Sequence, residues 1–554
     1  MRFLKRSFII VIMIAVKWIF LPETCHAVTS SEFCQQKEDT LKLPESVSKE
    51  ELEHFRRRGI IAGHAGGPDY SAGNRARSEK VRHYQNEIER FGGEKIGRGQ
   101  RYLYNPKLMD QAWTLMLHKQ GYITTDEART VLSGLEKVEV GGERKLKMVL
   151  DEHHASIPYF GKTMQEPLSH MWIREKQLDV IDAIHSLLGV LLNKAERHSE
   201  TIMPGMSHMA HAQPITYGSY LLALHDGISR GLEYLELAYK HTNQNNAGCG
   251  ATSGSGFYVD RDYITELLGF DETKELTYDA EPGQDWVMST LYGLSNIMLV
   301  VSRTAMDHSI WGMDGYSTHL LEAGGSQFMP HKAHAGSEWE HIRISVNNIL
   351  GTTYMGVNAL NKEPLMDVLT IYQAAYRSPN VGAIGALCEA EMTLGILEYD
   401  IENLRVDREK LLQLTRDGWG CTTDLVAKLV LENDLGVRQA HRICGVMVRM
   451  ARVHRKLKPY ELTGAMLDEA ARLSDDPEPH LTTEELREIM DPVKFIERHN
   501  NLGEPNPNET IRMVNDRRMQ LKESQQRNVL RRERVEKGFE ILRTEIDNIL
   551  ISDK

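Results

Sequence analysis

Apolar residues repeat at alternating steps of three and four along two long stretches of this chain. The first stretch contains Ile181, Ile184, Leu188, Leu191 and Ala195, and the second contains Leu291, Leu294, Met298, Val301, Ala305 and His308. This spacing puts the apolar side chains on one stripe of a helix, and long helices bury such stripes by packing along their length. Few segments alternate as strands do. The chain is therefore predicted to be mainly all-α, with a long central helical bundle.

The chain has 554 residues, which is enough for several domains. We predict an N-terminal domain at 28–162, the bundle at 163–407, a C-terminal helical domain at 408–510 and a helical tail at 511–554. The tail carries a heptad-like seam of Val535, Phe539, Leu542, Ile546 and Ile549 among many charges. Such a seam packs either on a partner subunit or on its own domain, and the sequence leaves both open.

The first 27 residues have the features of a secretory signal. Arg2, Lys5 and Arg6 precede the apolar run Phe8 to Val16, and Ala27 is the small residue that signal peptidase prefers. The apolar run is too short and too interrupted for a good transmembrane helix. We expect a signal peptide at 1–27 that is cleaved after Ala27, and hence a secreted or periplasmic protein. An uncleaved N-terminal anchor is the alternative.

Composition argues against several other classes of protein. The formal net charge is -12, whereas a nucleic-acid partner would favour a basic face. The six cysteines are widely spaced and form no Cys-x-x-Cys pair, and the 23 histidines form no His-Glu-x-x-His pattern. The sequence therefore predicts neither a disulfide framework nor a zinc site. We expect no metal and no cofactor.

The most distinctive segment is a loop at 324–338 that is rich in glycine and small residues. It holds Ser326, Met329, Pro330 and Lys332 at fixed spacing, a pattern that a plain surface turn would not need. The pattern resembles the Gly-Ser-x-x-Met-Pro-x-Lys-x-Asn-Pro signature of the fumarase/aspartase superfamily of lyases. The resemblance implies that Ser326 is the catalytic serine and that Lys332 is the lysine of this signature.

Two more segments are similar to the argininosuccinate lyases of that superfamily. Met203 to Ile215 matches their Pro-Gly-x-Thr-His-x-Gln-x-Ala-Gln-Pro-Ile segment, with His208 on the acid/base histidine. Ser207 replaces the family's threonine, and Gln213 matches its glutamine. Taken alone, a histidine in a helical region is more often structural, but the surrounding motif favours a functional role for His208.

The third segment runs from Gly248 to Arg261. Its glycines have no strand–turn–helix context, so they are not a nucleotide fingerprint and more simply let the backbone approach the site closely. Weaker similarities at Asp279 to Asp285, Thr423 to Leu425 and Met490 to Pro492 extend the resemblance over roughly 104–512. Superfamily members are typically homotetramers with three-domain subunits and a site built from three chains, which is what the resemblance implies here.

The implied reaction is elimination of fumarate from an N-substituted aspartate. The proton next to the carboxylate is a poor acid, so its removal needs a cation such as Lys332 and fixed N–H donors around the resulting dianion. Ser326 would be the base, and His208 would give the departing amine its proton. Glu340 would orient His208. Its spacing from Lys332 is one residue longer than in the family, so Glu338 is an alternative candidate for orienting His208.

Departures from the family concern the substrate more than the reaction. Thr163 and Gln165 stand in the run that grips the substrate, where Met164 replaces an arginine. His154 occupies a further binding position upstream, although the adjacent His153 blurs the register, and His334 stands two residues after Lys332. The family's arginine-binding stretch is replaced by Asn361-Lys-Glu-Pro-Leu-Met-Asp367. We therefore predict a small dicarboxylate substrate other than argininosuccinate.

Two other interpretations stay open. A catalytically inactive relative could serve as a binding or structural protein, which the altered binding positions favour and the retained Ser326, His208 and Lys332 oppose. A lyase of the same fold could also expel a different leaving group. The sequence carries no direct discriminator between these bonds, only a closer overall match to the carbon–nitrogen branch.

Overall fold

The computed structural model describes residues 106–138, 142–163, 167–313, 317–318, 337–361, 363–368 and 382–551. Several sequence predictions lie outside these residues. They are the signal peptide at 1–27, most of the loop at 324–338, and Gln165, Ser326, Lys332 and His334.

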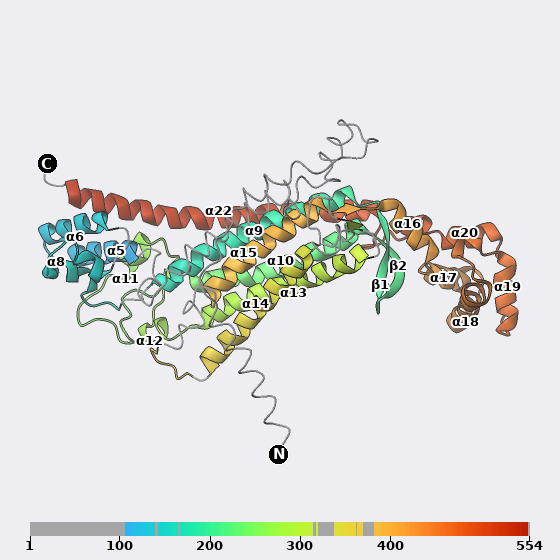
Figure 1. Ribbon diagram of the computed structural model, residues 1–554, viewed down its shortest axis with the longest axis horizontal. Coiled ribbons are helices and arrows are strands. Elements are labelled where there is room, and N and C mark those ends of the chain that lie inside the picture. The colour runs from blue at the N-terminus through green and yellow to red at the C-terminus, as the bar shows by residue number, and fades with distance from the viewer. Residues whose placement is uncertain are drawn as a thin grey trace, which may run out of the picture. The chain divides into compact units, whose positions relative to one another are not determined.

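Five long helices form the central bundle. They are α9 (Leu168–Arg197), α10 (Tyr217–Thr242), α13 (Asp285–Met313), α14 (Ser337–Asn361) and α15 (Ala383–Asn403). Helix α9 packs against α10 and α15, and α13 packs against α10 and α14 (Figure 1). The predicted stripes, from Ile181 to Ala195 and from Leu291 to His308, point into this core and are buried. The mainly α-helical class predicted from the sequence is confirmed.

The bundle has two ends with different contents. At one end, which we call the hairpin end, the Tyr217 amide at the start of α10 donates to the Thr201 carbonyl just beyond α9. The other end carries the glycine-rich segment Gly248 to Arg261, and we call it the glycine-loop end. There the His170 side chain, at the start of α9, hydrogen-bonds to the Thr242 carbonyl at the end of α10. Helix α9 has 30 residues, so the two ends are about 45 Å apart.

Small helices gather at the glycine-loop end. They are α5 (Pro106–Lys119), α6 (Thr125–Lys137), α7 (Glu143–Leu146), α8 (Glu152–Ser156), η1 (Ile157–Tyr159), α11 (Arg261–Leu267) and α12 (Thr277–Ala280). Helix α6 begins at a capping box, in which the Thr124 hydroxyl accepts the Glu127 amide and the Glu127 carboxylate accepts the Thr124 amide. That exchange satisfies two of the donors that a helix start leaves open.

Strands in the described part are short and pair two by two. Strand β1 (Ile202–Ser207) is antiparallel to β2 (Ala210–Thr216), β3 (Gln244–Asn245) is parallel to β4 (Glu272–Thr273), and β5 (Ser317–Thr318) is antiparallel to β6 (Arg405–Val406). Only β1 and β2 form a true hairpin, and it connects α9 to α10.

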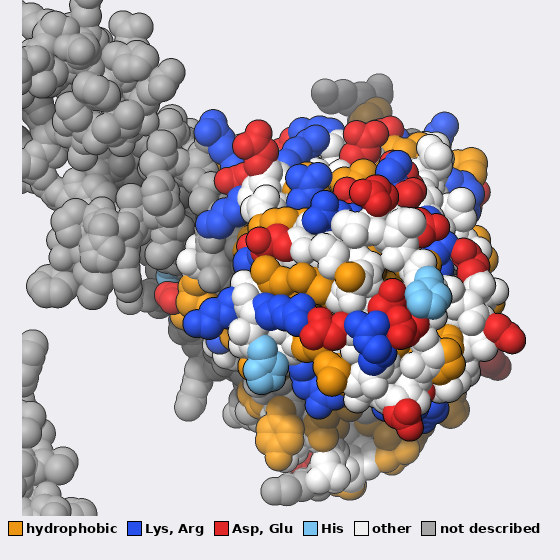
Figure 2. Space-filling view, turned by 90° about the vertical axis from the view of Figure 1, so that its right-hand side faces the viewer, with side chains coloured by type: hydrophobic (Ala, Val, Ile, Leu, Met, Phe, Trp, Pro, Cys, Tyr) orange, Lys and Arg blue, Asp and Glu red, His pale blue; other side chains and the backbone are white. Residues whose placement is uncertain are grey.

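The C-terminal domain has a hydrophobic core of its own. It comprises α16 (Arg408–Asp417), α17 (Thr422–Glu432), α18 (Val437–Arg449), η4 (Met450–Arg455), η5 (Pro459–Glu461), α19 (Gly464–Leu473), α20 (Thr483–Met490) and α21 (Pro492–Arg498). On the face drawn in Figure 2, Lys and Arg side chains are interspersed with Asp and Glu. This face is therefore not the single basic stripe that nucleic acids favour.

The tail forms one helix, α22 (Pro507–Ile551), that packs on its own chain. It lies along α9 and also contacts α5, α6, α10 and α11. Its arginines bond carboxylates of the bundle: Arg517 with Asp226, Arg531 with Glu236, and Arg532 with Asp179 and Asp182. The apolar seam from Val535 to Ile549 is buried, so the described chain covers it without a partner. No described helix is both long and apolar enough to cross a membrane.

Candidate active site

His208 lies at the tip of the β1–β2 hairpin. Ser207 pairs with Ala210 across the turn, and His208 and Met209 between them both have positive φ, 50° and 60°. A two-residue turn of this kind matches the twist of the flanking strands, but non-glycine residues adopt it at a cost. His208 and Ser207 are exposed. The tip therefore presents its imidazole and hydroxyl away from the protein's own core.

Gln213, the third predicted residue of this segment, lies on β2 near the C-terminal domain. Its side-chain Nε2 donates to the Thr423 hydroxyl at 3.2 Å. This contact makes Gln213 a structural link between the hairpin and α17, a role that the sequence pattern did not indicate.

Glu340 lies in the first turn of α14 and its side chain is exposed. Its neighbour Trp339 is buried and stacks on His308, with ring centroids 5.0 Å apart. The His308 Nδ1 lies 2.8 Å from the Thr304 carbonyl and so carries the proton. The Nε2 atom then accepts from the Tyr217 hydroxyl at 3.1 Å.

This aromatic cluster joins the start of α14 to the start of α10, directly after the hairpin. Glu340 and His208 therefore belong to the same end of the bundle. Among the described residues no ion pair joins the two, and both side chains are exposed.

Thr163 and His154 lie at the opposite, glycine-loop end. The His154 Nδ1 is 2.6 Å from Asp151, and its neighbour His153 contacts Glu127 instead, at 3.1 Å. The two adjacent histidines thus have separate carboxylate partners. Thr163 directly follows Lys162, whose ammonium forms a buried ion pair with Asp110 at 2.9 Å.

Asp110 gathers three donors around one buried carboxylate. Besides Lys162, the Tyr159 hydroxyl donates to it at 2.8 Å and the Gly142 amide at 3.0 Å. Burial raises the pKa of Tyr159, and the nearby charge of Asp110 adds to that effect. This network fixes the backbone immediately before Thr163.

The glycine-rich segment Gly248 to Arg261 also lies at this end. Gly250 has a φ of 58°, and a Cβ there would lie 2.7 Å from the Gly254 carbonyl oxygen. Arg261 closes the loop by donating to the carbonyls of Ala247 and Lys274. At Gly250 the segment approaches itself so closely that a larger residue would clash. The expected approach of this backbone to the active site stays a prediction.

The chain is similar to proteins of known function. A family model described as "Lyase" matches residues 167–335. The argininosuccinate lyase of Methanosarcina barkeri is 25% identical over 489 residues, covering 84% of this chain and 96% of that protein. The argininosuccinate lyase of Bacillus cytotoxicus is 28% identical over 415 residues, covering 71% of this chain and 86% of that protein.

Over most of its length the chain is therefore similar to argininosuccinate lyases, and residues 167–335 match the lyase family model.

Solved structures share the fold. An EDDS lyase variant with bound fumarate has a TM-score of 0.78 at 21% identity and covers 90% of this chain and 98% of its own. A class II fumarase from Schistosoma mansoni has a TM-score of 0.55 at 14% identity, covering 76% and 95%.

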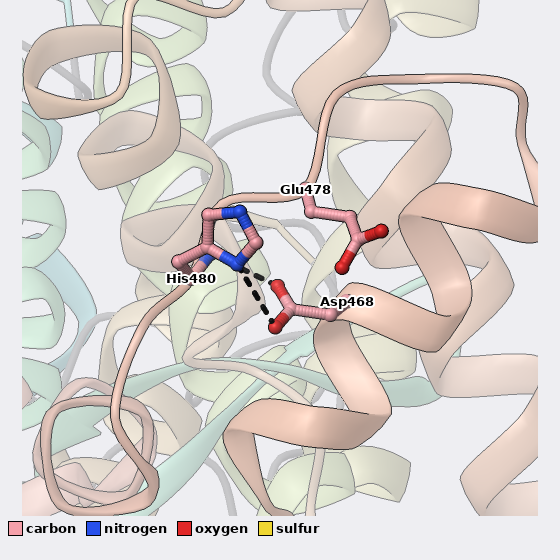
Figure 3. A group of neighbouring side chains, drawn as sticks. All are labelled: Asp468, Glu478 and His480. Carbon is pink, nitrogen blue, oxygen red and sulfur yellow. Dashed lines mark hydrogen bonds and ion pairs between the residues drawn. The ribbon is translucent and has the colours of Figure 1, made fainter.

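One group of possible metal ligands occurs in the described part of the chain. Asp468, Glu478 and His480 converge in the C-terminal domain, as Figure 3 shows, with ligand atoms within 4.8 Å of one another. Each already has a protein partner: His480 interacts with Asp468, and Glu478 accepts from Arg472 at 2.8 Å. The guanidinium charge of Arg472 beside Glu478 disfavours a cation there.

Proposed function

We propose that this protein is a carbon–nitrogen lyase that eliminates fumarate from an N-substituted aspartate. The observation that carries the proposal is similarity to argininosuccinate lyases over most of the chain, together with retention of Ser326, His208 and Lys332 from their motifs. The substrate is an aspartate whose amine part differs from arginine, because the stretch Asn361 to Asp367 lacks the family's arginine-binding pattern.

In this mechanism Ser326, as alkoxide, takes the proton from the carbon next to one carboxylate. Lys332 stabilises the dianion that forms. The electron pair then forms the double bond of fumarate while the carbon–nitrogen bond breaks. His208, in its protonated form, delivers a proton to the departing nitrogen, and the product is a neutral amine. Glu340 is the residue proposed to orient His208.

The active site is shared between subunits of a homotetramer. Two observations support this proposal. His208 and Thr163 lie at ends of the bundle about 45 Å apart, so one chain cannot bring them to one substrate. Three bundle helices also expose large apolar side chains that an oligomer would cover: Tyr234, Leu237, Tyr292, Leu299, Met306, Ile344 and Tyr354.

Export to a secreted or periplasmic location is part of the same proposal. It is supported by the N-terminal cations and apolar run at 1–27. Argininosuccinate is a cytoplasmic intermediate, so an exported enzyme is expected to meet a different amine. Fractionation of cells followed by N-terminal sequencing of the mature protein tests this, and a cytoplasmic protein that keeps residues 1–27 contradicts it.

The primary experiment is fumarate release, followed by ultraviolet absorbance, from a panel of N-substituted aspartates that includes argininosuccinate. Activity that Ser326→Ala abolishes supports the lyase, and the preferred substrate identifies the amine. Argininosuccinate as the best substrate contradicts the substrate proposal. No release in either direction contradicts the lyase and favours a binding protein of this fold or a different leaving group.

Shared sites have a direct test. His208→Ala and Ser326→Ala subunits are each expected to be inactive alone. When they are mixed and reassembled, some sites receive both intact residues from different chains, so partial activity returns. Mixtures that stay inactive while forming mixed tetramers contradict the shared site.

A further inference from the structure

The hairpin that carries His208 is attached to the C-terminal domain. We propose that Gly420 and Thr423, at the start of α17, are positioning residues that set where His208 is presented. The inference rests on the proposed function, because it takes His208 as the proton donor to the leaving amine. It adds a role for the C-terminal domain, which contributes none of the proposed catalytic groups.

The first attachment is a close approach of two backbones. A Cβ built on Gly420 would lie 2.1 Å from the carbonyl oxygen of Ala212 on β2, and 3.1 Å from the Cα of Gln213. Both neighbours are main-chain atoms, which cannot swing aside as a side chain can. Any residue larger than glycine at this position must therefore move the hairpin relative to α17.

The second attachment is a chain of two hydrogen bonds from the same turn. Gln213 donates from Nε2 to the Thr423 hydroxyl at 3.2 Å, and that hydroxyl donates to the Gly420 carbonyl at 3.5 Å. The turn that packs against Ala212 thus also holds the next residue of β2. Gln213 and Thr423 are exposed, so these bonds determine position more than stability.

The third attachment is hydrophobic. Ile202, the first residue of β1, is buried in the core of the C-terminal domain, whereas the next residue, Met203, is buried in the core of the bundle. Strand β1 also packs against α16 and α21. The root of the hairpin is therefore held between two cores, and the Gly420–Thr423 turn holds β2 closer to the tip.

Because the hairpin is long, a small rotation at its attachment moves His208 at its tip. His208 lies four positions before Ala212, which corresponds to at most about 14 Å of chain. A tilt of about 4° at the attachment then moves the tip by about 1 Å. A displacement of 1 Å in a catalytic group can reduce a rate by about 100-fold.

The variants that test the proposal change the attachment and leave His208 intact. Gly420→Ala introduces the forbidden Cβ, and Thr423→Val removes the hydroxyl at nearly constant volume. The matched controls are Gly445→Ala, in the same domain with nothing within 4 Å of the added Cβ, and Thr423→Ser, which keeps the hydroxyl.

We expect kcat to fall about 10–100-fold in Gly420→Ala and about 3–10-fold in Thr423→Val, with KM within about twofold. Both controls are expected to stay within about twofold of wild type. The loss should be larger for substrates that release a strongly basic amine than for those that release a weakly basic one, because only the former depend on proton donation by His208. A merely structural defect would lower both rates equally, and that result overturns the proposal.

Amide hydrogen exchange supplies a readout that does not need activity. Gly420→Ala and Thr423→Val should speed exchange at 206–210 while leaving the bundle helices protected, and Gly445→Ala should not. Unchanged exchange at the hairpin overturns the positioning role even in an active enzyme. A wild-type protein that releases no fumarate overturns the proposed function instead, and exchange then decides the attachment by itself.

Discussion

The two ends of the bundle are built differently. At the hairpin end, His208, Ser207 and Glu340 are exposed, and the turn that carries His208 adopts a backbone conformation that costs free energy. At the glycine-loop end, the polar network around Asp110 is turned inward. Asp110 and Lys162 form an ion pair whose side chains are only 2–3% exposed, and the backbone before Thr163 is fixed by it.

The two ends therefore have different roles: the hairpin end carries the reactive side chains, and the glycine-loop end carries a rigid backbone. The hairpin end offers chemically useful side chains to something outside the chain, and its turn tolerates exposure because little of the protein's own core depends on it. The glycine-loop end instead supplies a rigid backbone surface. Substitutions should therefore alter rate at the first end and stability at the second.

The largest effect is expected for His208→Ala. Loss of the proton donor should reduce kcat by about 100–10,000-fold, whereas an exposed turn residue should change the free energy of unfolding by no more than about 0.5 kcal/mol. Steady-state kinetics and urea denaturation measure the two quantities. The control is Met209→Ala in the same turn, where the side chain is 80% exposed and kcat should change little. A large stability loss in His208→Ala would contradict the contrast between the ends.

At the opposite end, Asp110→Ala should act on stability. It leaves the Lys162 ammonium buried without its partner, and breaking a buried pair in this way costs about 3–5 kcal/mol. The urea midpoint should fall accordingly. Asp126→Ala is the control, because Asp126 pairs with Arg129 at the surface and such pairs contribute at most about 1 kcal/mol. Equal losses in the two variants would be the contrary result.

The attachment of the tail is expected to depend on pH. Burial tends to raise the pKa of Asp226, but hydrogen bonds from Arg517 and His225 lower it well below the ordinary value of 3.8. The stabilisation is therefore present above about pH 4 and is lost as the pH falls through the lowered pKa of the folded state. Arg517→Gln should cost about 1–2 kcal/mol at pH 7, and the gap from wild type should shrink on acidification. A gap that does not shrink as the pH falls from 7 to 2 would contradict this account.

The smallest effects are expected for the threonine that caps a helix at each end of the bundle. Thr124 caps α6 at the glycine-loop end, and Thr216 caps α10 directly after the hairpin. Replacing either threonine by alanine should cost about 1 kcal/mol in unfolding free energy. Thr216→Ala should also reduce kcat, about threefold, because Thr216 is the last residue of β2 and its loss makes the end of this strand more mobile. Thr124→Ala should leave kcat unchanged. Equal kinetics in the two variants would count against the contrast.

The bundle could be predicted from the sequence because helical periodicity is a local property. The stripes from Ile181 and from Leu291 are buried as expected. The hairpin was missed although Pro204, Gly205 and Pro214 signal a break in any helix. A motif learned from a family says which residue reacts and does not say which element carries it.

Other features depend on contacts that no local pattern contains. The link between Gln213 and Thr423 spans 210 residues, and nothing near either residue predicts it. The orientation of Glu340 also depends on packing, but on packing of a residue next to it in the sequence. From the spacing alone, Glu338 was an alternative to Glu340 as the residue that orients His208. The burial of Trp339 fixes which face of α14 points inward, so that Glu340 faces outward.

The arginines of α22 have a consequence for how the chain is made. Arg532 bonds Asp182, a partner that is synthesised 350 residues earlier. At about 5–20 residues per second, the ribosome needs about 20–70 s to cover that distance. Throughout that time the side of α9 that later receives the tail stays open, so the bundle reaches its final form only after translation of the chain is nearly complete.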